Sequence, residues 1–260
     1  MASVFGTSPA LMFNRTKEMG EWRIFETADA VAEHVAEWLC ALACECDRDF
    51  AVCLSGGSTP RHLYRQLTRK PIAARFPWKH AHWFWGDERF VPHDSLDSNY
   101  RMAYDALFSH VPVTKDRIHA IPTEGLSPDE SAASYQTLLQ RYYGADQLDP
   151  VRPIFDVTLL GVGEDGHTAS LFPGSPSLQE DRRWVLPIVG EARETRITLT
   201  YPALDGSRNL AFFATGANKR HVLAKIRAGD TELPAARVRP VGYLNWFVDR
   251  RAVQVPSDRS

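Results

Sequence analysis

Residues 50–60 read FAVCLSGGSTP and combine the signals of a strand, a turn and a helix start. The uninterrupted apolar run at 50–54 is typical of a strand that is buried on both faces. Gly56 and Gly57 permit a tight turn, and Pro60 suits a first helical turn because its missing N–H has no partner to lose there. A buried strand that feeds directly into a helix is typical of parallel sheets, so this stretch predicts an α/β fold.

The same order of strand, turn and helix recurs along the chain. Further strands are expected at residues 81–89, 117–122, 155–163, 184–189, 196–201 and 209–216. Helices are expected to begin near Thr27, Pro60, Ser98, Ser127 and Lys219, and Ser127, Pro128 and Glu130 together form a capping box. The alternation predicts one α/β domain with a mainly parallel sheet covered on both faces, and the chain has no internal repeat or obvious linker.

The composition narrows the class of ligand. The chain has 260 residues and a net charge of -2, with no basic stripe for nucleic acid and no polybasic patch for a membrane surface. The N-terminal residues lack the apolar core of a signal peptide, and no run reaches the roughly 20 apolar residues of a spanning helix. We therefore expect a cytoplasmic protein that binds a small molecule, with no nucleic-acid or membrane partner, as either a monomer or a homodimer.

The four cysteines lie close together in the sequence, at Cys40, Cys44, Cys46 and Cys53. Such crowding differs from a disulfide framework and favours a reducing compartment. A metal site is the less favoured alternative. Cys40 and Cys44 have helical spacing within the apolar stretch WLCALAC, which favours burial in a helix over metal binding. We interpret them as small buried residues and expect no metal.

Residues 160–174 read LGVGEDGHTASLFPG, in which Gly161, Gly163 and Gly166 have the G-x-G-x-x-G spacing of dinucleotide-binding loops. Such a loop needs a full helix after its last glycine, because the pyrophosphate binds at the helix N-terminus. Only six residues separate Gly166 from Pro173, and the sequence PGSP that starts there ends any regular helix. The spacing is therefore interpreted as a coincidence, and no nicotinamide or flavin cofactor is expected.

The same stretch has features of a catalytic loop. Asp165, Gly166 and His167 lie just past the carboxyl end of a buried strand, where open α/β sheets bind their ligands. Glycine allows close approach to the backbone, and a histidine can act as a general base near neutral pH. From these residues alone, a structural loop histidine bonded to the backbone is an equal alternative.

Two further strands also end in polar residues. In SGGSTP, backbone amides, two hydroxyls and a helix N-terminus can hold a phosphate, although a simple tight turn is equally compatible. In GDER, an arginine fork suits a phosphate or carboxylate, and the carboxylates can orient it or bind sugar hydroxyls; a solvated ion pair is the alternative. The residues concerned are Gly56, Gly57, Ser58, Thr59, Asp87, Glu88 and Arg89.

Two cations occupy comparable positions later in the chain. Arg196 opens the strand RITLT, and Lys219 follows the glycine-containing loop ATGAN. A solvent-facing lysine is the commoner case. Because glycines, hydroxyls, carboxylates, a histidine and cations all recur at strand ends, we expect them to converge at one edge of the sheet.

Taken in order, these motifs resemble the 6-phosphogluconolactonase family. The resemblance runs from about residue 22 to 250, and its most specific parts are the GDER and DGHTASLFP blocks. The matching stretches are LSGGSTP, WGDERFVP with Ser98 and Asn99, LLGVGEDGHTASLFPG, RITLTYPAL, ATGANK and LPAARVRP. The chain departs from the family pattern at Glu164, where many members have proline, and at residues 192–194, which replace a proline-containing stretch.

The resemblance implies a fold and a reaction. The fold is a Rossmann-like three-layer α/β sandwich with a small additional lobe, shared with glucosamine-6-phosphate deaminases. We assign residues 21–252 to this single domain, residues 1–20 to an N-terminal extension that is expected to be poorly ordered, and residues 253–260 to a C-terminal tail. The implied reaction is hydrolysis of 6-phospho-D-glucono-1,5-lactone to 6-phosphogluconate in the oxidative pentose phosphate pathway, without metal or organic cofactor.

The resemblance also assigns roles to residues. His167 is expected to be the base that activates water, with Asp165 orienting it or the sugar. The sugar phosphate is expected to bind through the 56–59 loop and the cations, together with Asn99 and Gly166. Two alternatives stay open: an amino-sugar-phosphate isomerase or deaminase that uses Asp87 with His167, and a non-catalytic sugar-phosphate sensor of the same fold.

Overall fold

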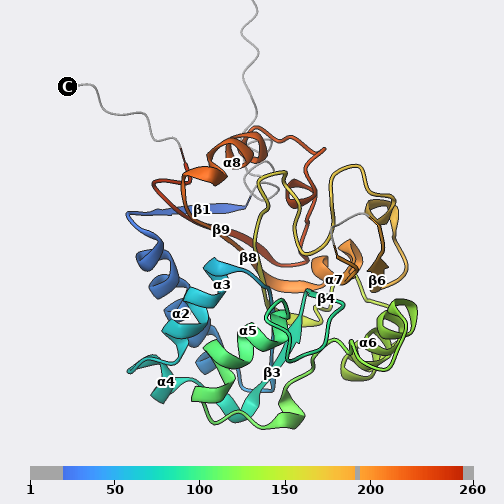
Figure 1. Cartoon of the computed structure of the whole chain (residues 1–260). Coiled ribbons are helices and arrows are strands. Elements are labelled where there is room, and N and C mark those ends of the chain that lie inside the picture. Colours follow the sequence, from blue (N-terminus) through green and yellow to red (C-terminus); the bar gives the residue numbers. More distant parts are fainter. Residues whose placement is uncertain (1–19, 191–193, 254–260) are drawn as a thin grey trace, which may run out of the picture.

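The computed structural model describes residues 20–190 and 194–253 (Figure 1). Its larger sheet has six strands in the order β1-β9-β8-β5-β2-β3, and all neighbouring pairs are parallel. These strands are β1 (Glu21–Phe25), β2 (Phe50–Leu54), β3 (Ala81–Trp85), β5 (Phe155–Leu160), β8 (Ser207–Ala214) and β9 (Tyr243–Asp249). A smaller antiparallel sheet contains β4 (Asp87–Arg89), β7 (Arg196–Leu199) and β6 (Val185–Ile188) in that order. The expected mainly parallel α/β sandwich with a small lobe is confirmed.

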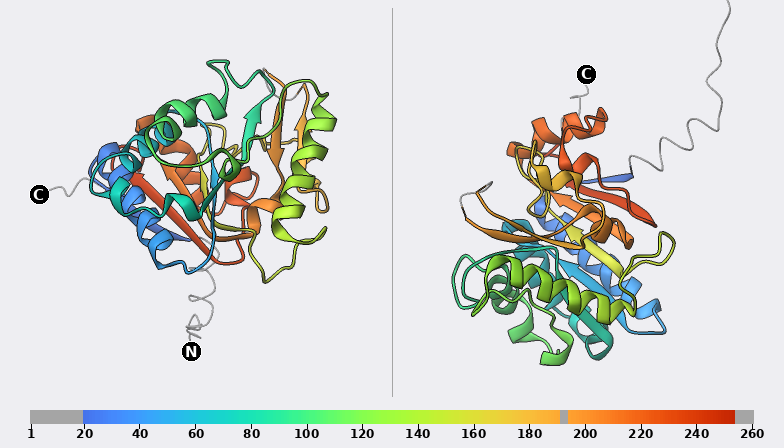
Figure 2. Two further views of the ribbon diagram at one scale, coloured as in Figure 1. Left: turned by 90° about the horizontal axis from the view of Figure 1, so that it is seen from below. Right: turned by 90° about the vertical axis from the view of Figure 1, so that its right-hand side faces the viewer.

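Helices cover both faces of the larger sheet and one side of the smaller one (Figures 1 and 2). Helices α2 and α3 lie on one face of the large sheet, and α8 lies on the other (Figure 1). Helix α6 packs against β6 and β7 of the small sheet. The helices are α2 (Ala28–Glu45), α3 (Ser58–Leu67), α4 (Ile72–Arg75), α5 (Asn99–Ala106), α6 (Pro128–Tyr143), α7 (Tyr201–Asp205) and α8 (Arg220–Arg227). Short 3₁₀ turns occur at Trp78–His80, Phe108–His110, Lys115–Arg117, Pro176–Gln179, Ala217–Lys219 and Pro234–Ala236.

The strongest local signals predicted their elements correctly. All five residues of β2 are buried, between β5 and β3. Thr27 caps α2 by accepting a hydrogen bond from the amide of Ala30 at 3.1 Å. The capping box of Ser127 and Glu130 is present, with Pro128 in the first turn of α6. These caps satisfy amides that have no partner inside the helix, which fixes where each helix begins.

Two predicted strands were wrong in extent. Residues 81–89 do not form one strand, because the chain leaves the large sheet at Gly86. The Gly86 amide donates to the carbonyl of Leu54, while its carbonyl accepts from the amide of Leu199 in the small sheet, both at 2.8 Å. Residues 117–122 form no strand, and only Ile118 makes an isolated parallel bridge to Trp83.

Two strands of the large sheet were missed. β1 and β9 pair with each other, and β9 also pairs with β8. A stack of aromatic rings spans the three strands: Trp246 of β9 lies between Trp22 of β1 and Phe212 of β8, with ring centroids 4.7 and 4.1 Å away. Such contacts add about 0.5–1.5 kcal/mol per pair beyond burial. The N-terminal extension, residues 1–20, lies outside the described residues except for Gly20, so its expected poor order stays a prediction. The C-terminal tail, residues 253–260, lies outside them except for Val253.

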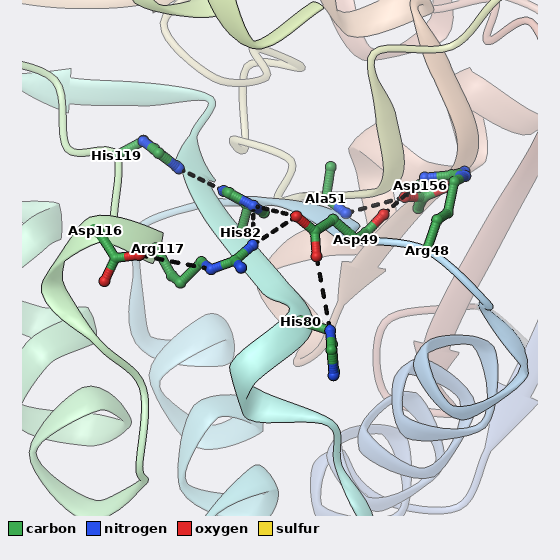
Figure 3. Close-up of polar contacts among 9 residues, drawn as sticks. All are labelled: Arg48, Asp49, Ala51, His80, His82, Asp116, Arg117, His119 and Asp156. Carbon is green, nitrogen blue, oxygen red and sulfur yellow. Dashed lines mark hydrogen bonds and ion pairs between the residues drawn. The ribbon is translucent and has the colours of Figure 1, made fainter.

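A polar cluster lies where β2 and β3 begin, at the β3 edge of the large sheet (Figure 3). This edge cluster comprises Asp49, His80, His82, Arg117 and His119. His82 bonds through Nδ1 to His119 Nε2 at 2.8 Å and through Nε2 to Asp49 Oδ2 at 3.0 Å, and Arg117 also donates to Asp49 at 2.6 Å. His80 lies 3.8 Å from the other Asp49 oxygen. The cluster attaches the segment that contains Arg117 and His119 to the sheet edge.

The edge cluster predicts acid sensitivity. Burial, and then the charges of His82 and Arg117, lower the pKa of His119 from 6.5 to about 4, while Asp116 raises it slightly. The unfolded chain therefore binds more protons between these values, and stability falls as the pH drops from about 6.5 to about 4. Because His119 is only partly buried, we expect a loss of about 1–2 kcal/mol after solvent screening.

His119→Phe is expected to remove this part of the pH dependence. The ring of His119 stacks on Phe84 at 4.5 Å between centroids, so phenylalanine keeps the contact and loses the proton. Urea unfolding at pH 7 and pH 4.5 measures the change, with His110→Phe at an exposed site as the matched control. An unchanged difference between the two pH values in His119→Phe would contradict the prediction.

Candidate active site

A cleft of about 220 Å³ lies at the carboxyl end of the large sheet, beside the small sheet. Eight of the predicted site residues line it: Gly56, Gly57, Asp87, Arg89, Asn99, His167, Arg196 and Lys219. Five others lie next to the cleft in the chain without lining it: Ser58, Thr59, Glu88, Asp165 and Gly166. The carboxyl-terminal edge of a parallel sheet thus brings together residues from distant parts of the sequence.

The loop after β5 folds tightly around the histidine. The Gly163 amide donates to the carbonyl of His167 at 2.8 Å, and the Gly166 amide donates to the carbonyl of Gly163 at 3.1 Å. A Cβ on Gly163 would come within 2.1 Å of His167 Nδ1, so only glycine leaves room for the imidazole. Gly166 has a φ of +87°, in the left-handed region that favours glycine. The glycines of the G-x-G-x-x-G spacing therefore shape this loop.

The structure has no helix between β5 and the 3₁₀ turn at Pro176–Gln179. The chain after Gly166 forms turns and a single bridge between Thr168 and Leu171 instead. A pyrophosphate would find no helix N-terminus there. The prediction that no full helix follows Gly166 is confirmed.

Asp165 and His167 form a hydrogen-bonded pair. Asp165 Oδ1 lies 2.6 Å from His167 Nδ1 and also accepts a bond from the His167 amide at 3.1 Å. Although burial raises the pKa of Asp165, the bond from the His167 amide and the charge of the imidazole hold it below its usual value. An ionised carboxylate at Nδ1 favours the tautomer with its proton on Nδ1, which leaves the lone pair on Nε2.

The turn after β2 forms a second wall of the cleft. Gly57 has a φ of +111° and precedes α3, which begins at the carboxyl end of β2. A Cβ on Gly56 would lie 1.9 Å from Asn99 Oδ1, so the turn depends on glycine at this position. The start of a ten-residue helix beside a glycine turn is suited to an anion.

Among residues 20–190 and 194–253, three cationic side chains line the cleft. Arg89 and Arg196 come from the small sheet, and Lys219 follows β8 of the large sheet. Arg89 Nη1 donates to Asn99 Oδ1 at 3.0 Å, and Arg196 lies 3.8 Å from Asp87. The Nε atoms of both arginines are buried without a hydrogen-bond partner among the described residues. A buried donor without a partner is costly, so the two guanidinium groups are candidates for binding an anionic ligand.

Asp87 is held at the floor of the cleft. Its carboxylate accepts a hydrogen bond from Ser170 Oγ at 2.7 Å, and the side chain is largely buried. The side-chain Nδ2 of Asn99 donates to the main-chain carbonyl of Asp87 at 2.9 Å. Asp87 therefore links Arg196, Asn99 and the segment after His167.

Glu88 points away from the cleft into the protein. It is 1% exposed and accepts bonds from the amides of Arg89 at 2.8 Å, Asn99 at 2.7 Å and Tyr100 at 2.7 Å. The hydroxyl of Ser98 adds a fourth bond at 3.1 Å. Burial raises the pKa of Glu88, and the hydrogen bonds from the three amides offset this only in part. The sequence predicted that Glu88 contacts the substrate, whereas in the structure its carboxylate accepts hydrogen bonds from neighbouring backbone amides.

Sequence reasoning missed Ser55. Its hydroxyl is buried without a partner among the described residues and lines the cleft. The main chain of Ser55 is fixed by Tyr64, whose hydroxyl accepts from the Ser55 amide at 3.0 Å and donates to its carbonyl at 2.7 Å. The available signal was its position as the first polar residue after the buried strand. Ala169 was missed too; it lines the cleft with a φ of +47°, a strained conformation for alanine.

Other classes of site are not evident in the described ranges. Within residues 20–190 and 194–253, no three His, Cys, Asp or Glu side chains are grouped so that they could hold a metal ion. No helix in this part of the chain has the length and apolar character needed to cross a bilayer.

Comparison with known proteins gives a consistent picture. The family model described as glucosamine-6-phosphate isomerases/6-phosphogluconolactonase matches residues 26–246. The human 6-phosphogluconolactonase is 38% identical over 94% of this chain and 92% of its own length. A 6-phosphogluconolactonase from Nostoc is 40% identical over 78% of this chain and 83% of its own.

A solved structure supports the same grouping. The crystal structure of 6-phosphogluconolactonase from Thermotoga maritima is 32% identical, covers 88% of this chain and 99% of its own, and has a TM-score of 0.74. The range matched by the family model includes every residue that lines the cleft. The chain belongs to the glucosamine-6-phosphate isomerase/6-phosphogluconolactonase family.

Proposed function

We propose that this protein hydrolyses 6-phospho-D-glucono-1,5-lactone to 6-phosphogluconate in the oxidative pentose phosphate pathway. The observation that carries the proposal is the pairing of His167 with Asp165 in a cleft that also contains three cations. A base is needed at one end of the substrate and a phosphate site at the other. The cleft contains candidates for both, and the Nostoc and human relatives are named 6-phosphogluconolactonase.

Substrate binding follows from the charges of the cleft. The phosphate is remote from the reacting carbon, and Arg89, Arg196 and Lys219 supply the cations that it requires. The hydroxyl of Ser55 and the turn at Gly56 and Gly57 add uncharged donors. Binding energy at the phosphate holds the lactone carbonyl beside His167, which converts affinity into orientation.

The chemical step needs one base. His167 Nε2 takes a proton from water as the water oxygen forms a bond to the lactone carbonyl carbon. The tetrahedral intermediate then collapses, the bond to the ring oxygen breaks, and the imidazolium returns its proton to that oxygen. Asp165 stabilises the imidazolium that forms between the two steps. A lactone is already an activated ester, so this route needs no covalent nucleophile and no cofactor.

The direct test is lactone hydrolysis by the purified protein, corrected for the spontaneous rate. Turnover of the phosphorylated lactone supports the proposal and excludes a non-catalytic sensor. Incubation with glucosamine 6-phosphate and an ammonia assay test the deaminase alternative, which would use Asp87 with His167. Ammonia release without lactone turnover would replace the proposal with that alternative.

Arg89→Ala is expected to raise KM for the lactone by roughly 10–100-fold with a smaller change in kcat. The variant removes a charge-assisted contact with the phosphate and leaves the Asp165–His167 pair intact. Steady-state kinetics measure the two constants, and Arg101→Ala is the matched control because Arg101 forms an exposed ion pair with Asp105. A loss confined to kcat would assign Arg89 to the chemical step instead.

A cytoplasmic location is part of the same proposal. Cys40, Cys44, Cys46 and Cys53 are all free thiols, which supports a reducing compartment. The ligand is a small sugar phosphate, with no nucleic-acid or membrane partner, and the choice between monomer and homodimer stays a prediction to be tested by light scattering.

A further inference from the structure

Two loops of the cleft are joined by a side-chain hydrogen bond that the proposed reaction does not use. Asn218 Nδ2 donates to Glu164 Oε1 at 2.7 Å. Glu164 belongs to the base loop, residues 161–167, which follows β5. Asn218 belongs to the cation turn, residues 215–219, which follows the neighbouring strand β8. The bond thus connects the segment carrying His167 with the segment carrying Lys219.

On one side, Glu164 is coupled closely to His167. The amide of Gly163 donates to the carbonyl of His167 at 2.8 Å, and the imidazole lies against the Gly163 Cα, where no Cβ fits. Asp165, the next residue after Glu164, holds Nδ1 of the same ring at 2.6 Å. A displacement of Glu164 therefore displaces the imidazole.

On the other side, the cation turn is anchored at its base. Thr215 Oγ1 lies 3.3 Å from Thr59 Oγ1, and the Gly216 amide donates to Asp249 Oδ1 at 3.0 Å. Asn218 is exposed, and its bond to Glu164 holds the tip of the turn immediately before Lys219. The tip thus depends on one side-chain contact with the base loop.

The acceptor of this bond is the carboxylate of Glu164, which does not line the cleft. The chemistry proposed for this enzyme has no use for a carboxylate there. A carboxylate that accepts a hydrogen bond from the opposite loop has a positioning use instead.

We propose that Glu164 and Asn218 are positioning residues that set the separation between the base His167 and the cation Lys219. The inference rests on the proposed lactonase activity. The lactone is held at its phosphate and attacked at its carbonyl. The distance between these two parts of the substrate must therefore match the distance between Lys219 and His167. A shift of about 1 Å in such a pair is enough to lower turnover strongly.

The test is a double-mutant cycle with Glu164→Ala, Asn218→Ala and the combined variant. Each single change is expected to lower kcat by about 3–10-fold, the effect of one exposed hydrogen bond to a charged group. The combined variant is expected to be no slower than either single variant, because both remove the same contact. Glu164→Gln keeps the Oε1 acceptor and is expected to retain most of the wild-type kcat.

Inhibition by inorganic phosphate separates positioning from binding. The three cations remain in every variant, so the inhibition constant is expected to change by less than about twofold. Glu37→Ala is the matched control, since Glu37 is an exposed carboxylate that pairs with Arg75, and neither residue lines the cleft. Additive single effects, or wild-type kcat in both alanine variants, would overturn the inference. A wild-type protein without lactonase activity would instead overturn the proposed function on which it rests.

Discussion

Replacing His167 by alanine is expected to lower kcat for lactone hydrolysis by on the order of 10²–10⁴-fold. The variant removes the group that takes the proton from water and returns it to the ring oxygen. The loop should keep its shape, because the bond between the Gly163 amide and the carbonyl of residue 167 is made by the backbone. KM is expected to change little, since the phosphate-binding cations remain in place.

Initial rates with the phosphorylated lactone, corrected for spontaneous hydrolysis, measure this effect. His110→Ala is the matched control, because His110 is exposed and its imidazole bonds only to the carbonyl of Asp105 among the described residues. Added imidazole is expected to restore part of the activity of His167→Ala by occupying the space left by the ring. Wild-type kcat in His167→Ala would falsify the assignment of the base.

Replacing Glu88 by alanine is expected to destabilise the protein by about 3–5 kcal/mol. The change leaves the buried amides of Arg89, Asn99 and Tyr100 without their acceptor, and each unsatisfied amide costs about 1–3 kcal/mol unless water enters. For a domain of this size the loss corresponds to a fall in Tm of on the order of 10 °C. Arg89 and Asn99 should also move, so the variant is expected to bind the lactone more weakly.

Thermal and urea unfolding measure the destabilisation. Glu124→Ala is the matched control: Glu124 is an exposed carboxylate that accepts one amide bond, from His93 at 3.0 Å. We expect the control to lose less than about 1 kcal/mol. Equal losses in the two variants would show that the buried position of Glu88 contributes nothing beyond a single surface bond.

Elements with strong local signals were predictable from the sequence. The apolar run of β2, the caps of α2 and α6 and the glycine-rich turns each express a short-range preference that needs no knowledge of the rest of the chain. β1 and β9 lack such a signal, because their pairing joins the two ends of the domain. The break at Gly86 was also hidden, since only the tertiary fold decides that its amide and carbonyl bond to different sheets.

The site was predictable in its residue types and less so in their roles. Histidine, glycines and arginines at strand ends indicated a cleft, and eight of the predicted residues line it. The sequence alone does not distinguish a Glu88 that forms a solvated ion pair with Arg89 from a buried one. Only the fold shows that the Glu88 carboxylate accepts bonds from the amides of Asn99 and Tyr100. Ser55 was missed because a serine in a glycine-rich turn has no distinctive sequence signal. Its hydroxyl lacks a hydrogen-bond partner among the described residues, and this is a property of the packed structure.

The origin of the cleft's cations has a consequence for how the molecule resists unfolding. Arg89 and Arg196 belong to the small sheet, and Lys219 follows β8 of the large sheet, so a phosphate ester bound by all three would join the two sheets. A ligand that binds only the folded chain stabilises it by about 2.7 kcal/mol when present at a hundred times its Kd. We therefore expect the protein to resist proteolysis better when its sugar phosphate is abundant than when the supply falls.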